Sequence, residues 1–309
     1  MKAAVTGGAG FIGSNLVRRL LKEGHEVTVI DDLSSGELAF LPEGFKNYYI
    51  QDFASDFVCD MVRAKKFDVI FHLAAKPRVG YSVEHPFETN DTNVSKTVKL
   101  LEASRGNIKR FVNTSSSSVY GDTDRLPTPE FTQHAPQSPY ALQKSISEQY
   151  CKLFSELYGL DTVSVRPFNV FGPNSRGDSP YATAVSAWFG AVQDGRPLRS
   201  DGTGEQSRDI TYVDNTVDIF YRCAMHEKKF NGEAFNAGTG FSITNNEVLA
   251  WFKKTYPECT VVNAPVRPGD VMATCADITR AQDHLGYEVL VPFWDGVERT
   301  RQWVFGDKE

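Results

Sequence analysis

A glycine-rich turn near the start of the chain constrains the fold more than any other feature of the sequence. Gly7, Gly10 and Gly13 follow a short apolar segment and precede a stretch whose apolar residues recur at helical spacing. The first glycine allows a tight turn, the second lets backbone N–H groups approach a pyrophosphate, and the third lets the helix pack closely on the strand. The next apolar segment ends at Asp31, 18 residues after Gly13. This pattern predicts a dinucleotide site on a strand–turn–helix unit.

The acidic residue at the end of the second strand indicates which dinucleotide is bound. The carboxylate of Asp31 can accept hydrogen bonds from both ribose hydroxyls and would repel a 2′-phosphate, so NAD is favoured over NADP. Asp52 follows the next extended segment and is expected to accept a hydrogen bond from the adenine amino group. The simpler interpretations are an ordinary glycine-rich turn for the first motif and a solvated carboxylate for Asp52.

Strands and helices alternate through the first half of the chain, which predicts an α/β fold with a doubly wound parallel sheet (Rossmann). The expected strands are 3–6, 27–30, 68–73 and 110–114, and the expected helices are 14–23, 88–104 and 139–158. Proline and glycine gather later, at 171–176, 194–205 and 263–270, which indicates a smaller, discontinuous C-terminal substrate-binding α/β lobe. We expect residues 1–170 plus about 206–231 in the Rossmann domain, and about 171–205 plus 232–309 in the lobe.

Composition narrows the classes of partner. The 309 residues carry a formal net charge of −6, so nucleic acid is not an expected partner, because an acidic chain does not attract a polyanion. The five cysteines are far apart and include no CxxC pair. This favours reduced thiols in a cytoplasmic protein, with neither a disulfide framework nor a metal site. No apolar run approaches the length of about 18 residues that a membrane-spanning helix needs, so no membrane partner is expected.

A serine-rich strand end and a tyrosine–lysine pair are the candidate catalytic groups. The serine run ends an expected strand, where open α/β sheets bind their ligands. Tyr140 and Lys144 are four residues apart and share one face of the expected helix. An ammonium beside a phenol lowers the phenol's pKa, so Tyr140 can act as a general base while a serine hydroxyl holds the reacting alcohol. The simpler interpretation of this pair is a solvent-exposed helix surface.

A series of motifs in the same order resembles one branch of a known family. The chain is similar to extended short-chain dehydrogenases/reductases, in their NAD-dependent nucleoside-diphosphate-sugar epimerase/dehydratase branch, and most similar to UDP-glucose (UDP-N-acetylglucosamine) 4-epimerases. The resemblance covers essentially the whole chain. The matching motifs are residues 6–14, 31–36, 72–75, 116–121, 140–144, 166–173, 207–209 and 267–270.

The resemblance assigns roles to individual residues. It implies that Ser116, Tyr140 and Lys144 are catalytic. It implies a cofactor site for NAD formed by Gly7, Gly10, Phe11, Ile12, Gly13, Asp31, Asp32, Ser35, Gly36, Asp52, Phe53, Leu73, Ala74, Ala75, Asn93, Thr114, Tyr140 and Lys144. It implies a UDP-sugar site formed by Ser116, Ser118, Tyr140, Asn169, Arg208, Arg267, Asp270 and Thr274. It also implies a homodimer formed through helices 88–104 and 139–158.

The residues before Val119 distinguish the reactions of this branch. The 4,6-dehydratases of this branch carry Asp-Glu where this chain has Ser117 and Ser118, and its UDP-glucuronate decarboxylases carry Glu where it has Ser118. The serine-rich form resembles the 4-epimerases, in which a 4-keto sugar takes the hydride back on its opposite face. We therefore expect a UDP-hexose 4-epimerase acting on UDP-glucose/UDP-galactose, and on their N-acetyl forms if the small Thr274 leaves room. Arg78, near the expected sugar site, keeps UDP-glucuronate 4-epimerisation open.

Two other functions remain as alternatives at this point. A 4,6-dehydratase or decarboxylase would need its acidic groups relocated to other positions. A non-catalytic, NAD-sensing regulator is disfavoured because such proteins typically lack the tyrosine–lysine pair.

The chain also departs from the family pattern at three places. Gln51 stands where the family usually has a glycine before the aspartate. Lys96, three residues after Asn93, stands where the family usually has a glycine. Pro167 stands where many 4-epimerases have a tyrosine. Lys96 suggests looser packing of its helix, and Pro167 leaves the nicotinamide contacts open.

Overall fold

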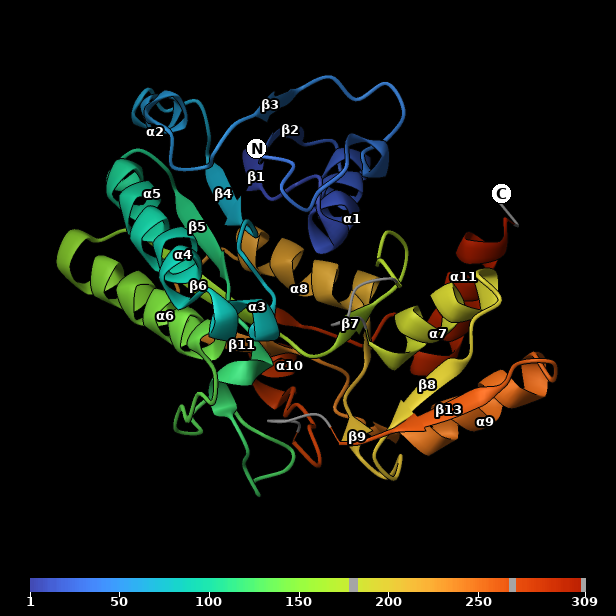
Figure 1. Ribbon diagram of the computed structural model, residues 1–309. Helices are drawn as coiled ribbons and strands as arrows, with labels where there is room; N and C mark the ends of the chain where they lie inside the picture. Colours follow the sequence, from blue (N-terminus) through green and yellow to red (C-terminus); the bar gives the residue numbers. More distant parts are fainter. Residues whose placement is uncertain (178–182, 267–270, 307–309) are drawn as a thin grey trace.

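The computed structural model describes residues 1–177, 183–266 and 271–306 (Figure 1). Its strands are β1 (Lys2–Thr6), β2 (Glu26–Asp31), β3 (Tyr48–Ile50), β4 (Val69–His72), β5 (Arg110–Thr114), β6 (Thr162–Pro167), β7 (Val170–Phe171), β8 (Leu198–Asp201), β9 (Ser207–Arg208), β10 (Thr211–Tyr212), β11 (Glu233–Ala237), β12 (Ile243–Thr244) and β13 (Val261–Ala264).

The α-helices are α1 (Phe11–Lys22), α2 (Asp56–Arg63), α3 (Val79–Glu84), α4 (Pro86–Asn90), α5 (Lys96–Ser104), α6 (Pro139–Tyr158), α7 (Ala184–Gln193), α8 (Val213–Met225), α9 (Asn245–Thr255), α10 (Thr279–Leu285) and α11 (Phe293–Phe305). Short 3₁₀ turns are η1 (Leu38–Phe40) and η3 (Ser117–Tyr120), and η2 (Asp91–Ser95) is a π-helical turn. None of the helices in the described part of the chain is long and apolar enough to cross a membrane.

The main sheet confirms the expected fold class. Its seven strands lie in the order β11-β6-β5-β4-β1-β2-β3, and every neighbouring pair is parallel. Parallel neighbours need crossover connections, which the helices between the strands provide. The strand order reverses between β1 and β4, so the carboxyl ends of these strands flank the crevice in which open α/β sheets bind ligands.

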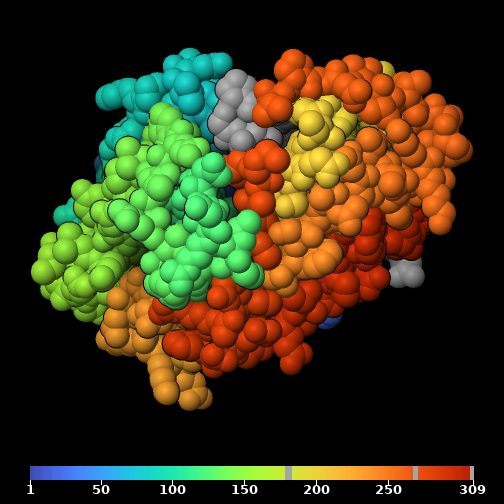
Figure 2. Space-filling view, turned by 90° about the horizontal axis from the view of Figure 1, so that it is seen from below, coloured from blue at the N-terminus to red at the C-terminus, as the bar shows by residue number. Residues whose placement is uncertain are grey.

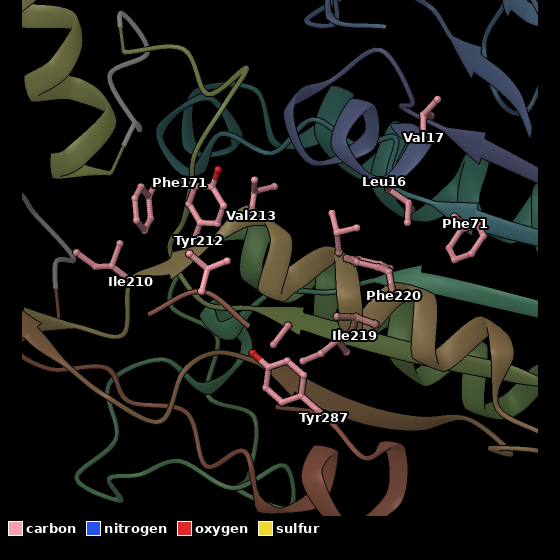
Figure 3. Close-up of a cluster of buried hydrophobic side chains, with 14 of the residues drawn as sticks. Leu16, Val17, Phe71, Phe171, Ile210, Tyr212, Val213, Ile219, Phe220 and Tyr287 are labelled. Carbon is pink, nitrogen blue, oxygen red and sulfur yellow. The ribbon is translucent and has the colours of Figure 1, made fainter. Parts of the chain in front are cut away.

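Side chains of the central strands alternate between two cores, one on each face of the sheet. In β1, Ala3 and Val5 belong to one buried cluster and Ala4 to the other. The first cluster packs against α1 and α8, and Figure 3 shows Leu16 and Phe220 of these helices together with Phe71 of β4. The second cluster lies beneath α2, α5 and α6, on the other face of the sheet. Burial on both faces explains why the strands read as short, continuous apolar runs.

Outside the main sheet, the C-terminal half forms short strand pairs and further helices. β8 pairs with β13, β9 with β12 and β7 with β10, while α7 packs against α9 and α11. Residues 274–276 of this half meet the loop that follows η3, where the Thr128 N–H donates to the Cys275 carbonyl at 2.8 Å. Figure 2 shows this green loop against the red-orange segment, with the yellow and orange lobe beside it.

One local expectation was wrong. Residues 233–237, assigned to the second lobe, form β11, which pairs with β6 at the edge of the main sheet. The expected helix 88–104 is present, but it consists of α4, the π-turn η2 and α5 in direct succession. A π-turn adds one residue to a turn without disturbing the apolar spacing on either side, so periodicity does not reveal it. The other domain boundaries stay predictions.

Candidate active site

The glycine turn has the geometry that its sequence requires. Gly7 has a φ of +68°, and a Cβ there would lie 2.7 Å from the backbone nitrogen of Ala74. A Cβ on Gly13 would collide with the Gly7 carbonyl oxygen, so only glycine lets α1 start this close to β1. Helix α1 begins after Gly10 without a side-chain cap. Its first N–H groups are therefore available to an anionic ligand, and the helix dipole adds to their attraction.

Asp31 is held against this turn. Its carboxylate accepts hydrogen bonds from the Ala9 N–H and the Leu33 N–H, both at 2.9 Å. Burial of the carboxyl raises its pKa above the ordinary value, while these two hydrogen bonds act in the opposite direction. The side chain therefore has a fixed orientation at the carboxyl end of β2.

One cavity of about 290 Å³ joins the glycine turn to the candidate catalytic residues. The wall contains most residues that the sequence assigned to the cofactor: Gly7, Gly10, Phe11, Ile12, Gly13, Asp31, Asp32, Ser35, Phe53, Leu73, Ala74, Ala75, Thr114, Tyr140 and Lys144. Ser116 lines it as well. These residues come from the carboxyl ends of β1, β2, β4 and β5, from the segment after β3 and from α6, so the fold brings distant motifs to one edge of the sheet.

Helix α6, which carries Tyr140 and Lys144, is positioned by its capping residues. The hydroxyl of Ser138 accepts a hydrogen bond from the Ala141 N–H, Pro139 occupies the first turn, and Gly159 ends the helix in a left-handed conformation. The Tyr140 N–H also donates to the Ser82 hydroxyl at 3.1 Å, which ties α3 to the start of α6. These bonds fix where the Tyr140 side chain enters the cavity.

Tyr140, Ser116 and Lys144 form a connected group. The hydroxyls of Tyr140 and Ser116 share a hydrogen bond, and Ser118 donates from its own hydroxyl to that of Ser116 at 2.9 Å. The Lys144 ammonium donates to the Thr114 carbonyl at 2.7 Å and lies 5.9 Å from the centre of the Tyr140 ring. Three segments of the chain thus converge on one phenol.

Burial dominates the protonation of this group. It raises the pKa of Tyr140 to about 12, although the hydrogen bond with Ser116 acts to lower it, and it reduces the pKa of Lys144 to about 8. The sequence predicted that the ammonium would lower the pKa of the phenol. In this structure burial determines the direction of the shift. Removing the phenolate from water destabilises it more than a lysine at this distance stabilises it.

Buried polar atoms without partners line the same cavity. The hydroxyls of Thr114 and Ser115 are fully buried and have no hydrogen-bond partner in the part of the chain that the structure describes. Such orphaned groups are costly unless a ligand satisfies them. Together with the glycine turn and Asp31, they fit a nucleotide cofactor with several hydrogen-bonding groups.

Comparison with known proteins identifies the family. Residues 3–238 match the model of the NAD dependent epimerase/dehydratase family. The UDP-glucose 4-epimerase of Mycolicibacterium smegmatis is 37% identical over 97% of both chains. The structure of a UDP-N-acetylglucosamine 4-epimerase from Methanobrevibacter ruminantium, in complex with UDP-N-acetylmuramic acid, has a TM-score of 0.92 at 34% identity, covering 99% of both chains. The chain belongs to the NAD dependent epimerase/dehydratase family.

The cofactor of this family member is NAD. A similar structure, the UDP-glucose 4-epimerase of Thermus thermophilus, is solved in complex with NAD (TM-score 0.88, 30% identity, complete coverage of both chains). Members with other reactions also match. A UDP-glucuronate 4-epimerase of Thermodesulfobacterium geofontis is 30% identical over 97% of this chain and 94% of its own. A dTDP-glucose 4,6-dehydratase of Streptomyces venezuelae has a TM-score of 0.89 at 27% identity over 99% and 98%. Membership alone therefore leaves the reaction and the sugar open.

Three residues assigned to the cofactor lie off the cavity wall in this epimerase/dehydratase family member. Gly36 packs against the turn, where a Cβ would lie 2.9 Å from the Ala9 carbonyl group. Asp52 is paired with Lys96 at 2.6 Å. The Asn93 side chain accepts a hydrogen bond from the Lys76 N–H at 2.8 Å and donates to the Lys76 carbonyl at 3.1 Å. It also donates to the Gln143 side chain at 2.8 Å. Asn93 therefore supports the loop after β4.

The predicted substrate residues that are described form bonds with one another and with the backbone. Asn169, with a φ of +38°, donates to the Thr274 hydroxyl at 3.2 Å and to the Asp209 carbonyl at 3.0 Å. Arg208 donates to backbone carbonyl groups of residues 207, 271 and 272. Within the described residues, none of Ser118, Asn169, Arg208 and Thr274 lines the cavity. Arg267 and Asp270 lie outside the described residues.

The cavity wall also contains residues without a role assigned from the sequence: Ile30, Ser34, Gln51, Lys76, Pro77, Thr92, Ser115 and Pro167. Several of them are direct sequence neighbours of assigned residues at the carboxyl ends of strands, so they could have been predicted from the expected strand ends. Thr92 is different, because it reaches the wall through the π-turn η2, which left no signal in the sequence.

Proposed function

We propose that the protein is an NAD-dependent UDP-hexose 4-epimerase, acting on UDP-glucose/UDP-galactose and on their N-acetyl forms. The observation that carries this proposal is the complete Ser116–Tyr140–Lys144 group beside serines at positions 117 and 118. An elimination or a decarboxylation needs an additional acid or base at the sugar. Neither hydroxyl serves that purpose near neutral pH.

Each residue of the site has a separate role in the proposed reversible oxidation at C4 of the sugar. Tyr140 takes the proton of the sugar 4-hydroxyl and returns it after the 4-keto sugar has presented its opposite face. Ser116 holds the same hydroxyl in line, and Ser118 orients Ser116 through the 2.9 Å hydrogen bond. Lys144 is fixed by the Thr114 carbonyl and contributes positive charge near the phenol. NAD supplies the hydride acceptor and, in its oxidised form, a positive charge that favours the Tyr140 phenolate.

The diphosphate and sugar ends are assigned by the resemblance. Asn169, Arg208 and Thr274 would bind the substrate. The bond from Asn169 to Thr274, and the bonds from Arg208 to the backbone of residues 271 and 272, support this because they bring the segments together. A guanidinium suits a diphosphate because it offers paired donors. The small Thr274 side chain favours a pocket with room for a 2-N-acetyl group.

A product panel tests the reaction and the sugar together. Purified protein is incubated separately with UDP-glucose, UDP-N-acetylglucosamine and UDP-glucuronate, and the C4 epimers are resolved by chromatography. Conversion of the first two supports the proposal. Conversion of UDP-glucuronate alone would establish the uronic-acid alternative, and a 4-keto-6-deoxy sugar or UDP-xylose would establish a dehydratase or decarboxylase.

We also propose that the protein is a homodimer formed through α4, α5 and α6. Helix α6 carries an apolar stripe that could pack on the sheet or contact a partner: Leu142, Ile146, Tyr150, Leu153 and Leu157. Leu142, Leu153 and Leu157 are 49%, 43% and 62% exposed, and Phe87 of α4 is 85% exposed. The helices that carry these exposed side chains, α4, α5 and α6, pack on one another along one side of the molecule (Figure 1), which supports contact with a second copy.

Light scattering tests the dimer. We expect twice the monomer mass for the wild type and the monomer mass for a Leu142→Glu, Leu153→Glu double variant. Val262→Glu, at an exposed apolar residue of β13, is the matched control and should remain dimeric. A monomeric wild type at micromolar concentration would refute this part of the proposal.

A further inference from the structure

A buried polar cluster joins two of the elements that carry the candidate catalytic residues. Its centre is Arg166, near the end of β6, which is 4% exposed. The guanidinium donates to both carboxylate oxygens of Glu148 on α6, at 2.8 and 2.6 Å, and to the hydroxyl of Tyr120 at the end of η3, at 2.7 Å. Glu148 and Tyr120 are buried as well. Within the described residues, none of the three lines the cavity, so the proposed reaction gives them no direct role.

The two partners of Arg166 lie on the same elements as the reacting hydroxyls. Tyr120 follows Ser116 by four residues, from the cap of η3 to its last residue. Glu148 follows Tyr140 by eight residues, which is about two turns of α6. The hydroxyls of Ser116 and Tyr140 share a hydrogen bond. The guanidinium therefore bridges the two elements whose separation sets the distance between these hydroxyls.

The short turn η3 depends on contacts with its neighbours. It is a four-residue 3₁₀ turn, and the hydrogen-bond geometry of such turns is poor, so their own bonds do not fix their orientation. Its start is held because the Ser115 N–H donates to the Val165 carbonyl at 2.7 Å. Its end is held because Arg166, the next residue of β6, binds the Tyr120 hydroxyl. Two successive residues of β6 therefore hold both ends of the segment that carries Ser116.

Stability alone does not account for this cluster. Burying a guanidinium and a carboxylate destabilises a fold by about as much as their attraction stabilises it, and apolar side chains of similar volume often serve equally well. A guanidinium differs in direction, because its planar fork binds a carboxylate with two donors and leaves others for further partners. The remaining bonds of Arg166 go to the Glu130 carbonyl at 2.9 Å and to Nε2 of His134 at 2.8 Å. The cluster therefore fixes the orientation of every segment that it contacts.

We propose that Arg166 is a positioning residue for catalysis. By binding η3 and α6 at once, it holds the Ser116 hydroxyl at hydrogen-bonding distance from Tyr140. It acts through these two elements and touches neither substrate nor cofactor. Loss of one arm of the bridge should slow the proton transfer without weakening binding, because the bridge is not part of the cavity wall. This inference rests on the proposed roles of Ser116 and Tyr140 in the reaction.

The test is a double-mutant cycle between Tyr120→Phe and Ser116→Ala, with kcat and KM measured for a UDP-sugar converted in the product panel. Tyr120→Phe removes one arm of the bridge and leaves the pair of Arg166 and Glu148 in place. With Ser116 present, we expect kcat to fall about tenfold and KM to stay within about twofold, because small displacements of a positioned group reduce rates strongly. In Ser116→Ala, the same substitution should lower the residual kcat less than about twofold, because the group being positioned is absent.

Two further variants separate positioning from a general loss of stability. Ser155→Ala, near the C-terminal end of α6, removes a buried hydroxyl that donates to the Leu160 carbonyl at 2.6 Å. It should lower the urea midpoint about as much as Tyr120→Phe and leave kcat within about twofold of the wild type. Arg166→Lys keeps a positive charge beside Glu148 without the planar fork, so it should lower kcat as much as Tyr120→Phe.

Two kinetic outcomes would overturn the proposal. One is an unchanged kcat in Tyr120→Phe, and the other is an equal loss of kcat with and without Ser116. A crystal structure of Tyr120→Phe gives a readout that needs no turnover: we expect the hydroxyls of Ser116 and Tyr140 to lie beyond hydrogen-bonding distance, and an unchanged distance would also overturn it. A wild type inactive on every UDP-sugar would contradict the proposed function instead, and the crystal structure would then decide whether Arg166 positions Ser116.

Discussion

The cofactor end and the substrate end of this site differ in how their polar groups are satisfied. At the cofactor end, the buried hydroxyls of Thr114 and Ser115 have no partner among the described residues, and the N-terminus of α1 lacks a side-chain cap. At the proposed substrate end, Asn169 donates to Thr274, and the guanidinium of Arg208 donates to the backbone. A ligand at the first end can satisfy groups that the described residues leave without partners, whereas the described side chains of the second end already bond within the protein.

This difference shows where binding energy is expected to come from. A ligand at the cofactor end satisfies groups that are otherwise costly to bury, so each contact there adds to affinity. A ligand at the substrate end must replace existing hydrogen bonds, so its net gain per contact is smaller. Substitutions at the two ends should therefore differ in size and in the quantity that they change.

The largest effect is expected from Tyr140→Phe, which removes the hydroxyl that we propose transfers the proton, at the junction of the two ends. Turnover should fall at least about a hundredfold, within the range for loss of a general acid–base group. NAD⁺ affinity, measured by calorimetry, should stay within about twofold of the wild type. Turnover that survives the substitution would remove Tyr140 from the mechanism.

Gly13→Ala should disrupt the cofactor end before any ligand binds. The new Cβ collides with the Gly7 carbonyl, so the free energy of unfolding should fall by about 3 kcal/mol. Gly10→Ala is the matched control, because its Cβ would meet only the Gly7 carbonyl at 3.2 Å and should cost less than about 1 kcal/mol. Urea denaturation of nucleotide-free protein measures both. Equal losses would contradict the close approach of helix and turn.

Lys144 should make the stability of the cofactor end depend on pH. Its pKa of about 8 in the folded protein lies below its ordinary value of 10.5. Between these pH values the unfolded chain binds more protons, so the free energy of unfolding should increase with pH across this window. The wild type should gain roughly 2 kcal/mol relative to Lys144→Met between pH 8 and 10.5. Parallel pH profiles for the two proteins, from urea denaturation, would show that the ammonium is not desolvated.

Thr274→Val should have the smallest effect, at the substrate end. It removes the hydroxyl that accepts from Asn169 and keeps the volume, so we expect kcat/KM for the UDP-sugar to fall about fivefold. NAD⁺ affinity should not change. Thr255→Val, at an exposed threonine of α9, is the control. A change in NAD⁺ affinity with Thr274→Val would mean that the two ends are not separate.

The features predicted best from the sequence are those that depend on residues close together in the chain. Helix 139–158 was predicted with its observed bounds, because Ser138, Pro139 and Gly159 are capping residues with defined positions. The glycine turn was predictable because close approach excludes every side chain but hydrogen. The family resemblance added residues whose positions no local rule determines, such as Ser116.

What escaped prediction depends on contacts between distant segments. The expected role of Asp52 at the adenine stays a prediction, but its bond with Lys96, 44 residues away, could not be foreseen. Asn93 was assigned to the cofactor, but the π-turn places it beneath Lys76. The partners of Asn169 lie up to 105 residues away, so their mutual satisfaction is visible only in three dimensions.

Retention of a label at C4 tests the central claim most directly. UDP-glucose carrying deuterium at C4 is converted in ordinary water, and the product is examined by NMR and mass spectrometry. The account predicts UDP-galactose that keeps the deuterium at C4, because the hydride leaves and returns within one site. Loss of the label to solvent, or its appearance at another carbon, would contradict the proposed 4-epimerase mechanism.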